Sequence, residues 1–190
     1  MKLLSPVLFL LLVVPTCRSS TLEDACRSFA AGHPSIGYDY CIKTFQADKA
    51  STAAADARSL AAVAARIAGA KANATGAHIA ALSAMERDAR RRDRFAVCAE
   101  VYSDATDELG QAAEELARGA GGGADDDAVT QLSAALDAPG TCEDAFGEAD
   151  DTSPLAAEDT EFKKLATIAL AVAASLTPPP PSTPRPRISD

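Results

Sequence analysis

The chain has 190 residues, of which 47% are hydrophobic, 5% are aromatic and 24% are charged, and it contains no tryptophan. Its 27 acidic residues outnumber its 18 lysines and arginines, which gives a formal net charge of −9 at pH 7. An acidic surface repels phosphate backbones, so nucleic acid is not an expected partner, and the length suits one domain with its own core.

An apolar run near the N-terminus is typical of a secretory signal peptide. Lys2 precedes this run, which extends from Leu3 to Val14 and is followed by small polar residues. The run is shorter than the roughly 20 apolar residues that span a bilayer as a helix, and no second run of that length follows. We therefore predict that residues 1–19 are a signal peptide cleaved after Ser19, and that the mature chain is exported with no membrane segment.

Four of the five cysteines remain after this cleavage, at Cys26, Cys41, Cys98 and Cys142. In an oxidising compartment an even set of well-spaced cysteines predicts a disulfide framework, and four cysteines allow three pairings. The sequential pairing, Cys26 with Cys41 and Cys98 with Cys142, is favoured because each pair lies across a predicted helical turn. No CxxC spacing or companion set of histidines is present, so neither a metal site nor a cofactor is expected.

The first half of the chain is predicted to form two short helices and one long helical segment. The short helices lie within residues 22–45 and are separated at Gly32 to Pro34. The long segment covers residues 51–90, where apolar residues recur at steps of three and four. Two glycines lower its helix propensity, so it is expected to form either one bent helix or two.

The second half is predicted to contain three more helices and a tail. The first begins near Cys98 and stops at Gly119, because glycine just past the last periodic residue commonly ends a helix. Asp125 to Asp127 are expected to supply an N-cap and favourable first-turn charges for the next helix, which is expected to end at Pro139-Gly140. Ser153-Pro154 is expected to open the last helix. The proline-rich segment 177–190 is predicted to be disordered.

Two motifs resemble those of the plant invertase and pectin methylesterase inhibitor family. The stretch CAEVYSDATDEL, Cys98 to Leu109, resembles the second bundle helix of the family, and LSAAL with TCEDAF, within Leu132 to Phe146, resembles the third. The resemblance implies an all-α fold, an up-down-up-down four-helix bundle with an N-terminal helical hairpin extension and two disulfides. The inhibitor domain is then residues 20–176, divided into a hairpin at 20–47 and a bundle at 48–176.

The resemblance also implies a function. It predicts a monomeric, secreted inhibitor in the apoplast that occludes the active site of a cell-wall carbohydrate-active enzyme and catalyses nothing itself. The expected partner is pectin methylesterase or acid invertase. Invertase inhibitors of the family often carry Pro-Lys-Phe between the second and third bundle helices, where this chain has Gly122 to Asp125. The absence of Pro-Lys-Phe at this place and the sequence from Ser133 to Leu136 slightly favour pectin methylesterase as the target. In the other direction, the segment from Cys26 to Cys41 resembles a branch of the family named as invertase inhibitors.

Contact residues are expected on the second and third bundle helices, whose exposed faces in inhibitors of pectin methylesterase supply acidic and hydroxyl groups near the enzyme's cleft. For each matching position the alternative is an ordinary solvated side chain or a helix cap. The matching positions are Asp104, Asp107, Glu108, Asp127 and Thr130.

Other functions are weaker. Only His33 and His78 could act as a general base near neutral pH, and neither belongs to a catalytic motif. Small-molecule or lipid binding in the bundle needs a splayed core, whereas seams rich in alanine predict closely packed helices. The arginines between Arg87 and Arg94 are interpreted as a solvated helix face or turn. Asn73-Ala74-Thr75 is an N-glycosylation acceptor, which makes Asn73 a predicted glycan site.

Overall fold

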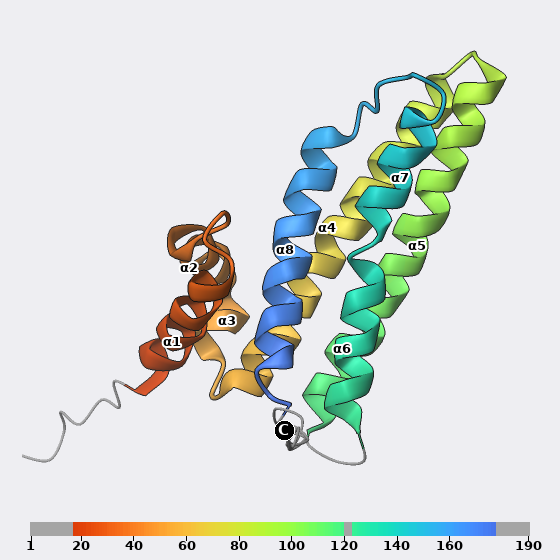
Figure 1. Ribbon diagram of the computed structural model, residues 1–190. Coiled ribbons are helices and arrows are strands. Elements are labelled where there is room, and N and C mark those ends of the chain that lie inside the picture. The colour runs from red at the N-terminus through yellow and green to blue at the C-terminus, as the bar shows by residue number, and fades with distance from the viewer. Residues whose placement is uncertain (1–16, 120–122, 178–190) are drawn as a thin grey trace, which may run out of the picture.

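The computed structural model describes residues 17–119 and 123–177, and all regular structure within them is helical (Figure 1). The predicted signal peptide and proline-rich tail lie almost wholly outside these residues. The helices are α1 (Cys17–Gly32), α2 (Tyr38–Gln46), α3 (Lys49–Ala53), α4 (Ala57–Met85), α5 (Ala89–Arg118), α6 (Ala124–Ala135), α7 (Ala138–Gly147) and α8 (Ala156–Ala174).

A four-helix bundle forms the body of the molecule, and its third member is made of α6 and α7 placed end to end (Figure 1). The order along the chain is up-down-up-down. Helix α4 packs against α5 and α8, and α6 also packs against α5 and α8, so α4 and α6 stand at opposite corners. The all-helical bundle with two disulfides confirms the fold class expected from the sequence.

Small side chains fill the seams of the bundle. On α4 the buried stripe contains Ala61, Ala65, Ala68 and Ala72, and the other helices also bury several alanines. Small side chains let helix axes approach closely. Leucines, isoleucines and a few aromatic residues supply the larger side chains of the core. Two aromatic pairs pack edge to face, Phe95 on Phe146 and Tyr102 on Phe162, each with ring centroids 5.3 Å apart.

The N-terminal hairpin of α1 and α2 is held together by one disulfide and stands beside α8 (Figure 1). Cys26 and Cys41 are fully buried and bonded, with their Cα atoms 5.6 Å apart. The Tyr40 hydroxyl donates a hydrogen bond of 2.6 Å to Glu161 Oε1 on α8. Lys164 Nζ lies 5.2 Å from the centre of the Tyr40 ring. Tyr40 therefore fastens the hairpin to the bundle through both its hydroxyl and its ring.

Two features of the first half were not settled by the sequence. The long segment forms the single helix α4, which starts with a capping box in which Asp56 and Ser59 bond each other's backbone N–H. The short helix α3 was not predicted. It is one turn that Asp48 caps by accepting hydrogen bonds from the N–H groups of Ala50 and Ser51.

Three expected boundaries in the second half were wrong. Gly123, at φ 91°, is the N-cap of α6, so none of the three acids caps the helix. Their expected first-turn charges are confirmed, because Asp125 to Asp127 fill the first turn, where negative charge favours the helix dipole. Pro139 lies in the first turn of α7 and does not end the helical structure, because a first-turn proline has no N–H to leave unpaired. Helix α8 begins at Ala156, two residues after Pro154.

The arginine cluster is more than a solvated turn. Arg94 and Arg91 reach Asp151, with Nη1 to carboxylate distances of 2.5 and 3.2 Å, and Arg91 also lies 5.6 Å from the centre of the Phe146 ring. These two side chains fasten the α7–α8 connection to α5. Arg87, Arg90 and Arg92 are exposed, as expected.

Candidate functional site

A continuous polar surface runs along the adjoining helices α5 and α6. Residues 104, 108 and 111 recur at steps of four and three, which places them on one side of α5, while Tyr102, Ala105 and Leu109 turn into the core. We name this surface the α5/α6 face. Its members are all exposed or half-buried, and none is a cation: Asp104, Asp107, Glu108, Gln111, Asp127, Thr130, Gln131 and Asp137.

Negative charge is concentrated around Glu108. This side chain is half-buried, and its burial raises the pKa of the carboxyl above its usual value. The charges of Asp104 and Asp137 raise that pKa further. The Asp137 carboxylate comes from the α6–α7 junction, so two bundle members contribute acids to one spot. Such a spot attracts a proton or a cationic group of a partner.

The α6 side of the face offers amide and hydroxyl groups. Gln131 Nε2 lies 3.3 Å from Glu115 Oε1 and 3.5 Å from Gln111 Oε1, so α5 and α6 are joined by polar contacts along the edge of the face. The Thr130 hydroxyl donates its proton to the Asp126 carbonyl at 2.9 Å. Its oxygen lone pairs remain available to accept a hydrogen bond from a partner.

The predicted contact residues divide into two groups. Asp104 and Glu108 are neighbours one turn apart, and Asp107 lies beside them on the exposed side of α5. Asp127 and Thr130 belong to the other end of the face, about three and about two helical turns before Asp137. For all five residues, contact with a target enzyme stays a prediction. Asp137, Gln111 and Gln131 were not predicted, although the four-residue step from Asp127 to Gln131 could have indicated the glutamine.

An apolar side chain extends the face. Val97 is 38% exposed and precedes Asp104 by seven residues, so both lie on the same side of α5. The next residue, Cys98, forms a disulfide with Cys142 of α7, and the Cα atoms of these two cysteines lie 4.6 Å apart. The disulfide fixes the position of α7 along α5 at the end of the face near Val97. Val97 is the one large exposed hydrophobic residue that the described part of α5 presents.

The described part of the α5–α6 connection presents few side chains to a partner. Arg58 on α4 binds Asp125 with both guanidinium ends, one of them at 2.6 Å, and this ion pair lowers the pKa of the Asp125 carboxyl. Gly123 has no side chain, and residues 120–122 lie outside the described residues. Within residues 119 and 123–125 no aromatic ring or cation is available.

Comparison with known proteins decides the family. The family model described as Plant invertase/pectin methylesterase inhibitor matches residues 15–172, which is most of the chain. The chain belongs to this family. Family membership confirms the resemblance read from the motifs, and it places the chain in a family of enzyme inhibitors.

Individual members of the family show moderate similarity. A Pectinesterase inhibitor of Actinidia deliciosa is 34% identical over 134 residues, covering 70% of this chain and 69% of the relative. A protein of Platanus acerifolia named "Putative invertase inhibitor" is 27% identical over 164 residues, covering 86% and 89%. A crystal structure of a mutant pectin methylesterase inhibitor from Arabidopsis shares the fold, with a TM-score of 0.60 and 24% identity over 72% of this chain and 88% of that one.

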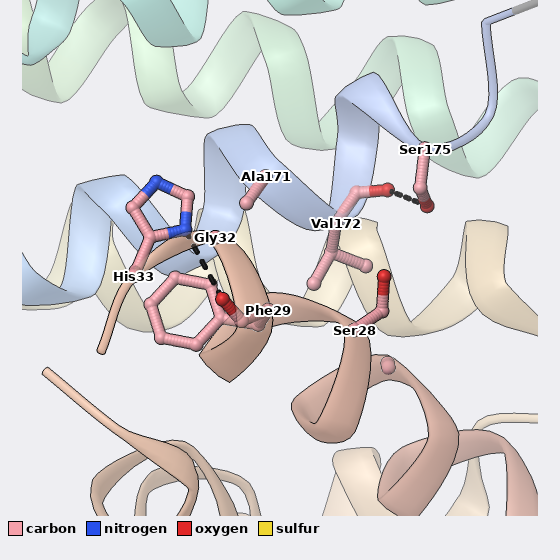
Figure 2. A pocket seen from close by; sticks show the side chains of 8 residues that line it. Ser28, Phe29, Gly32, His33, Ala171, Val172 and Ser175 are labelled. Carbon is pink, nitrogen blue, oxygen red and sulfur yellow. Dashed lines mark hydrogen bonds between the residues drawn. The ribbon is translucent and has the colours of Figure 1, made fainter.

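Both histidines have partners that account for them. His33 stacks on Phe29 with ring centroids 4.7 Å apart, and its Nδ1 lies 3.2 Å from the Phe29 carbonyl oxygen, to which it donates (Figure 2). His78 Nδ1 lies 2.8 Å from Glu158 Oε1, which links α4 to α8. His33 therefore closes the end of α1, and His78 joins two bundle helices.

A small pocket lies between the hairpin and α8. Figure 2 shows Phe29 of α1 and His33, the residue after that helix, facing Ala171, Val172 and Ser175. Its volume is about 100 Å³, whereas pockets for small molecules usually measure about 300 to 1,000 Å³. Among the described residues no helix has both the length and the apolar character needed to cross a membrane.

Proposed function

We propose that this chain is a secreted inhibitor that docks its α5/α6 face on a plant cell-wall enzyme and blocks the active-site cleft, with pectin methylesterase favoured over acid invertase. The observation that carries the proposal is the α5/α6 face itself. It is built on two bundle members locked together by packing and a disulfide, and it combines acids, amides and one exposed valine. Because the backbone of such a surface is already ordered, binding costs little backbone conformational entropy.

The preference for pectin methylesterase rests on the α5–α6 connection. Asp125 is already engaged by Arg58, and Gly123 offers no side chain, so the described part of the connection has nothing to fill a sugar pocket. Acid invertase remains the second candidate, because a relative of similar length is named as an inhibitor of invertase. Small-molecule or lipid binding is the weaker alternative, since the pocket of about 100 Å³ is too small for such ligands.

The proposal includes no catalysis by this chain. Nucleophilic or acid–base chemistry needs a base in reach of a reacting group within a cleft. His33 is held by Phe29 and His78 by Glu158, and the acids of the α5/α6 face are exposed or half-buried on the sides of helices. Their proposed role is to form hydrogen bonds and ion pairs with donors at the rim of the target's cleft.

A titration of enzyme activity tests this proposal. The oxidised mature chain is added separately to a plant pectin methylesterase and to a plant acid invertase at mildly acidic pH, and residual activity is followed. We expect pectin methylesterase activity to fall to near zero at an equimolar ratio, with invertase unaffected. Inhibition of invertase alone would reverse the choice of target. Inhibition of neither enzyme, by a chain whose helical circular dichroism is intact, would refute the proposal.

A further inference from the structure

The N-glycosylation acceptor Asn73-Ala74-Thr75 lies in the middle of α4, with its two critical side chains on opposite sides of the helix. Asn73 is exposed, whereas Thr75 is only 1% exposed. Successive residues of an α-helix are rotated by about 100°, so residues two apart point in nearly opposite directions. Thr75 takes a place in the buried stripe of α4, between Ala72 and Ile79.

The buried hydroxyl of Thr75 makes no hydrogen bond with any described residue. This is unusual for a helical threonine, because the hydroxyl can donate to a carbonyl one turn earlier. Six other helical threonines of the structure do so: Thr52, Thr106, Thr130, Thr141, Thr160 and Thr167. Thr75 is also the one polar residue among the buried residues of α4. Packing alone would favour valine, which has the same shape and no polar atom to leave unpaired.

We propose that Asn73 carries an N-linked oligosaccharide that covers the outer face of α4, and that threonine is kept at position 75 for this modification and not for packing. The donor is a lipid-linked oligosaccharide pyrophosphate. Asn73 Nδ2 loses one proton and forms a bond to C1 of the first sugar, the bond between C1 and the pyrophosphate oxygen breaks, and the lipid pyrophosphate leaves. Because the folded helix separates Asn73 from Thr75, the transfer precedes the folding of α4.

The glycan stands on a helix that contributes no residue to the proposed docking surface. The outer face of α4 around Asn73 is formed mainly by small exposed side chains, including Ala70, Ala74 and Ala77. Helix α4 stands at the corner opposite α6, since both pack against α5 and α8 (Figure 1). A bulky, hydrated glycan there shields α4 and leaves the α5/α6 face free. This inference rests on the proposed function for export and for the position of the docking surface.

Expression of the full chain in a eukaryotic secretory cell tests the modification. The molecular mass of the secreted protein is measured by mass spectrometry before and after enzymatic removal of N-glycans, and the same is done for the variants Asn73→Gln, Thr75→Val and Thr75→Ser. We expect a mass loss for the natural chain and Thr75→Ser, and none for Asn73→Gln and Thr75→Val. A natural chain whose mass is unchanged, whether it is secreted or retained, would overturn the glycan. This readout does not depend on whether the chain inhibits any enzyme.

Urea unfolding of protein made in bacteria, which lacks the glycan, tests the role assigned to Thr75. The midpoint for Thr75→Val is expected to equal or exceed that of the natural chain, because the buried polar atom disappears while the shape is kept. Thr75→Ser retains the hydroxyl and loses the packed methyl group, so its midpoint is expected to fall. A midpoint for Thr75→Val below that of Thr75→Ser would show that the hydroxyl is needed for the fold.

The position of the glycan is tested with the target enzyme of the titration described above. Glycosylated and deglycosylated chains are expected to inhibit with constants that agree within twofold. A tenfold weaker inhibition by the glycosylated chain would place the glycan at the interface and contradict its assignment to a free corner. If neither form inhibits, the proposed function fails, while the mass measurement still decides whether Asn73 is modified.

Discussion

Asp159 is a buried acid that no periodic pattern could reveal. It lies in the first turn of α8, is 4% exposed, and accepts a hydrogen bond from the Tyr102 hydroxyl. Burial is the main cause that raises the pKa of its carboxyl to about 7, and the neighbouring Glu143 adds to the rise, while the Tyr102 hydrogen bond works against it. Asp159 Oδ2 makes no hydrogen bond with any described residue, and a proton on the Asp159 carboxyl removes the negative charge that burial disfavours.

This acid predicts that stability decreases as pH rises from about 4 to 7. The folded chain binds a proton that the unfolded chain has released, because the pKa of Asp159 is raised from 3.8 to about 7. The stabilisation is therefore complete below pH 4 and is lost as pH rises through 7, at up to about 1.4 kcal/mol for each pH unit. Urea unfolding between pH 4.5 and 7.5 measures this slope.

The variant Asp159→Asn isolates the effect. Its amide accepts from Tyr102 and donates toward Glu143 at every pH, so we expect its unfolding midpoint to change much less over this range. Asp107→Asn, at an exposed position, is the control and should keep the slope of the natural chain. A slope in Asp159→Asn as steep as in the natural chain would contradict the assignment to Asp159.

At the scale of single elements, glycines act in opposite ways. Gly76 lies inside α4, and a Cβ added there would meet nothing within 4 Å, so Gly76→Ala should stabilise the fold by about 1 kcal/mol through helix propensity. Gly123 has φ 91°, so Gly123→Ala should destabilise by about 1 kcal/mol or more. Thermal unfolding of both variants checks this, and equal shifts in one direction would contradict it.

The two disulfides stabilise different parts of the chain. Cys98 and Cys142 are separated by 44 residues and join α5 to α7, whereas Cys26 and Cys41 are separated by 15 and close the hairpin. Loop entropy gives about 4 kcal/mol for the long loop and about 3 for the short one. Replacing both cysteines of the 98–142 pair by serine should therefore lower the free energy of unfolding more than the same change at 26–41. Urea titrations followed by circular dichroism compare the two variants, and the reverse order would contradict the loop-entropy argument.

Sequence patterns predicted the elements better than their ends. Glycine after Arg118 and the three-four stripes located α5 and α8, because stop signals and core-facing periodicity are local properties. The division of the third bundle member at Pro139 was missed, since a proline ends one helix or begins the next depending on what the chain does after it. Asp137, the neighbour of Glu108 from another bundle member, was missed for a different reason, because it reaches Glu108 only through the packing of α6 and α7 on α5.

At the scale of the whole molecule, different helices of the bundle carry different surface features. The α5/α6 face carries the acids proposed to meet an enzyme, α4 at the corner opposite α6 carries Asn73, and the hairpin is fastened to α8 through Tyr40. Family membership explains the scaffold, while the choice of target depends on side chains at one face. A scaffold of closely packed helices can change that face with little effect on its core.

Binding of pectin methylesterase by two charge-matched variants tests the central claim most directly. Asp107→Lys adds two positive charges within the α5/α6 face, and the double variant Ala70→Lys with Ala77→Lys adds the same charge on exposed positions of α4. We predict that Asp107→Lys raises the dissociation constant at least tenfold, about 1.4 kcal/mol, while the α4 variant stays within twofold of the natural chain. A larger loss from the α4 variant, or equal losses from both, would contradict docking through the α5/α6 face.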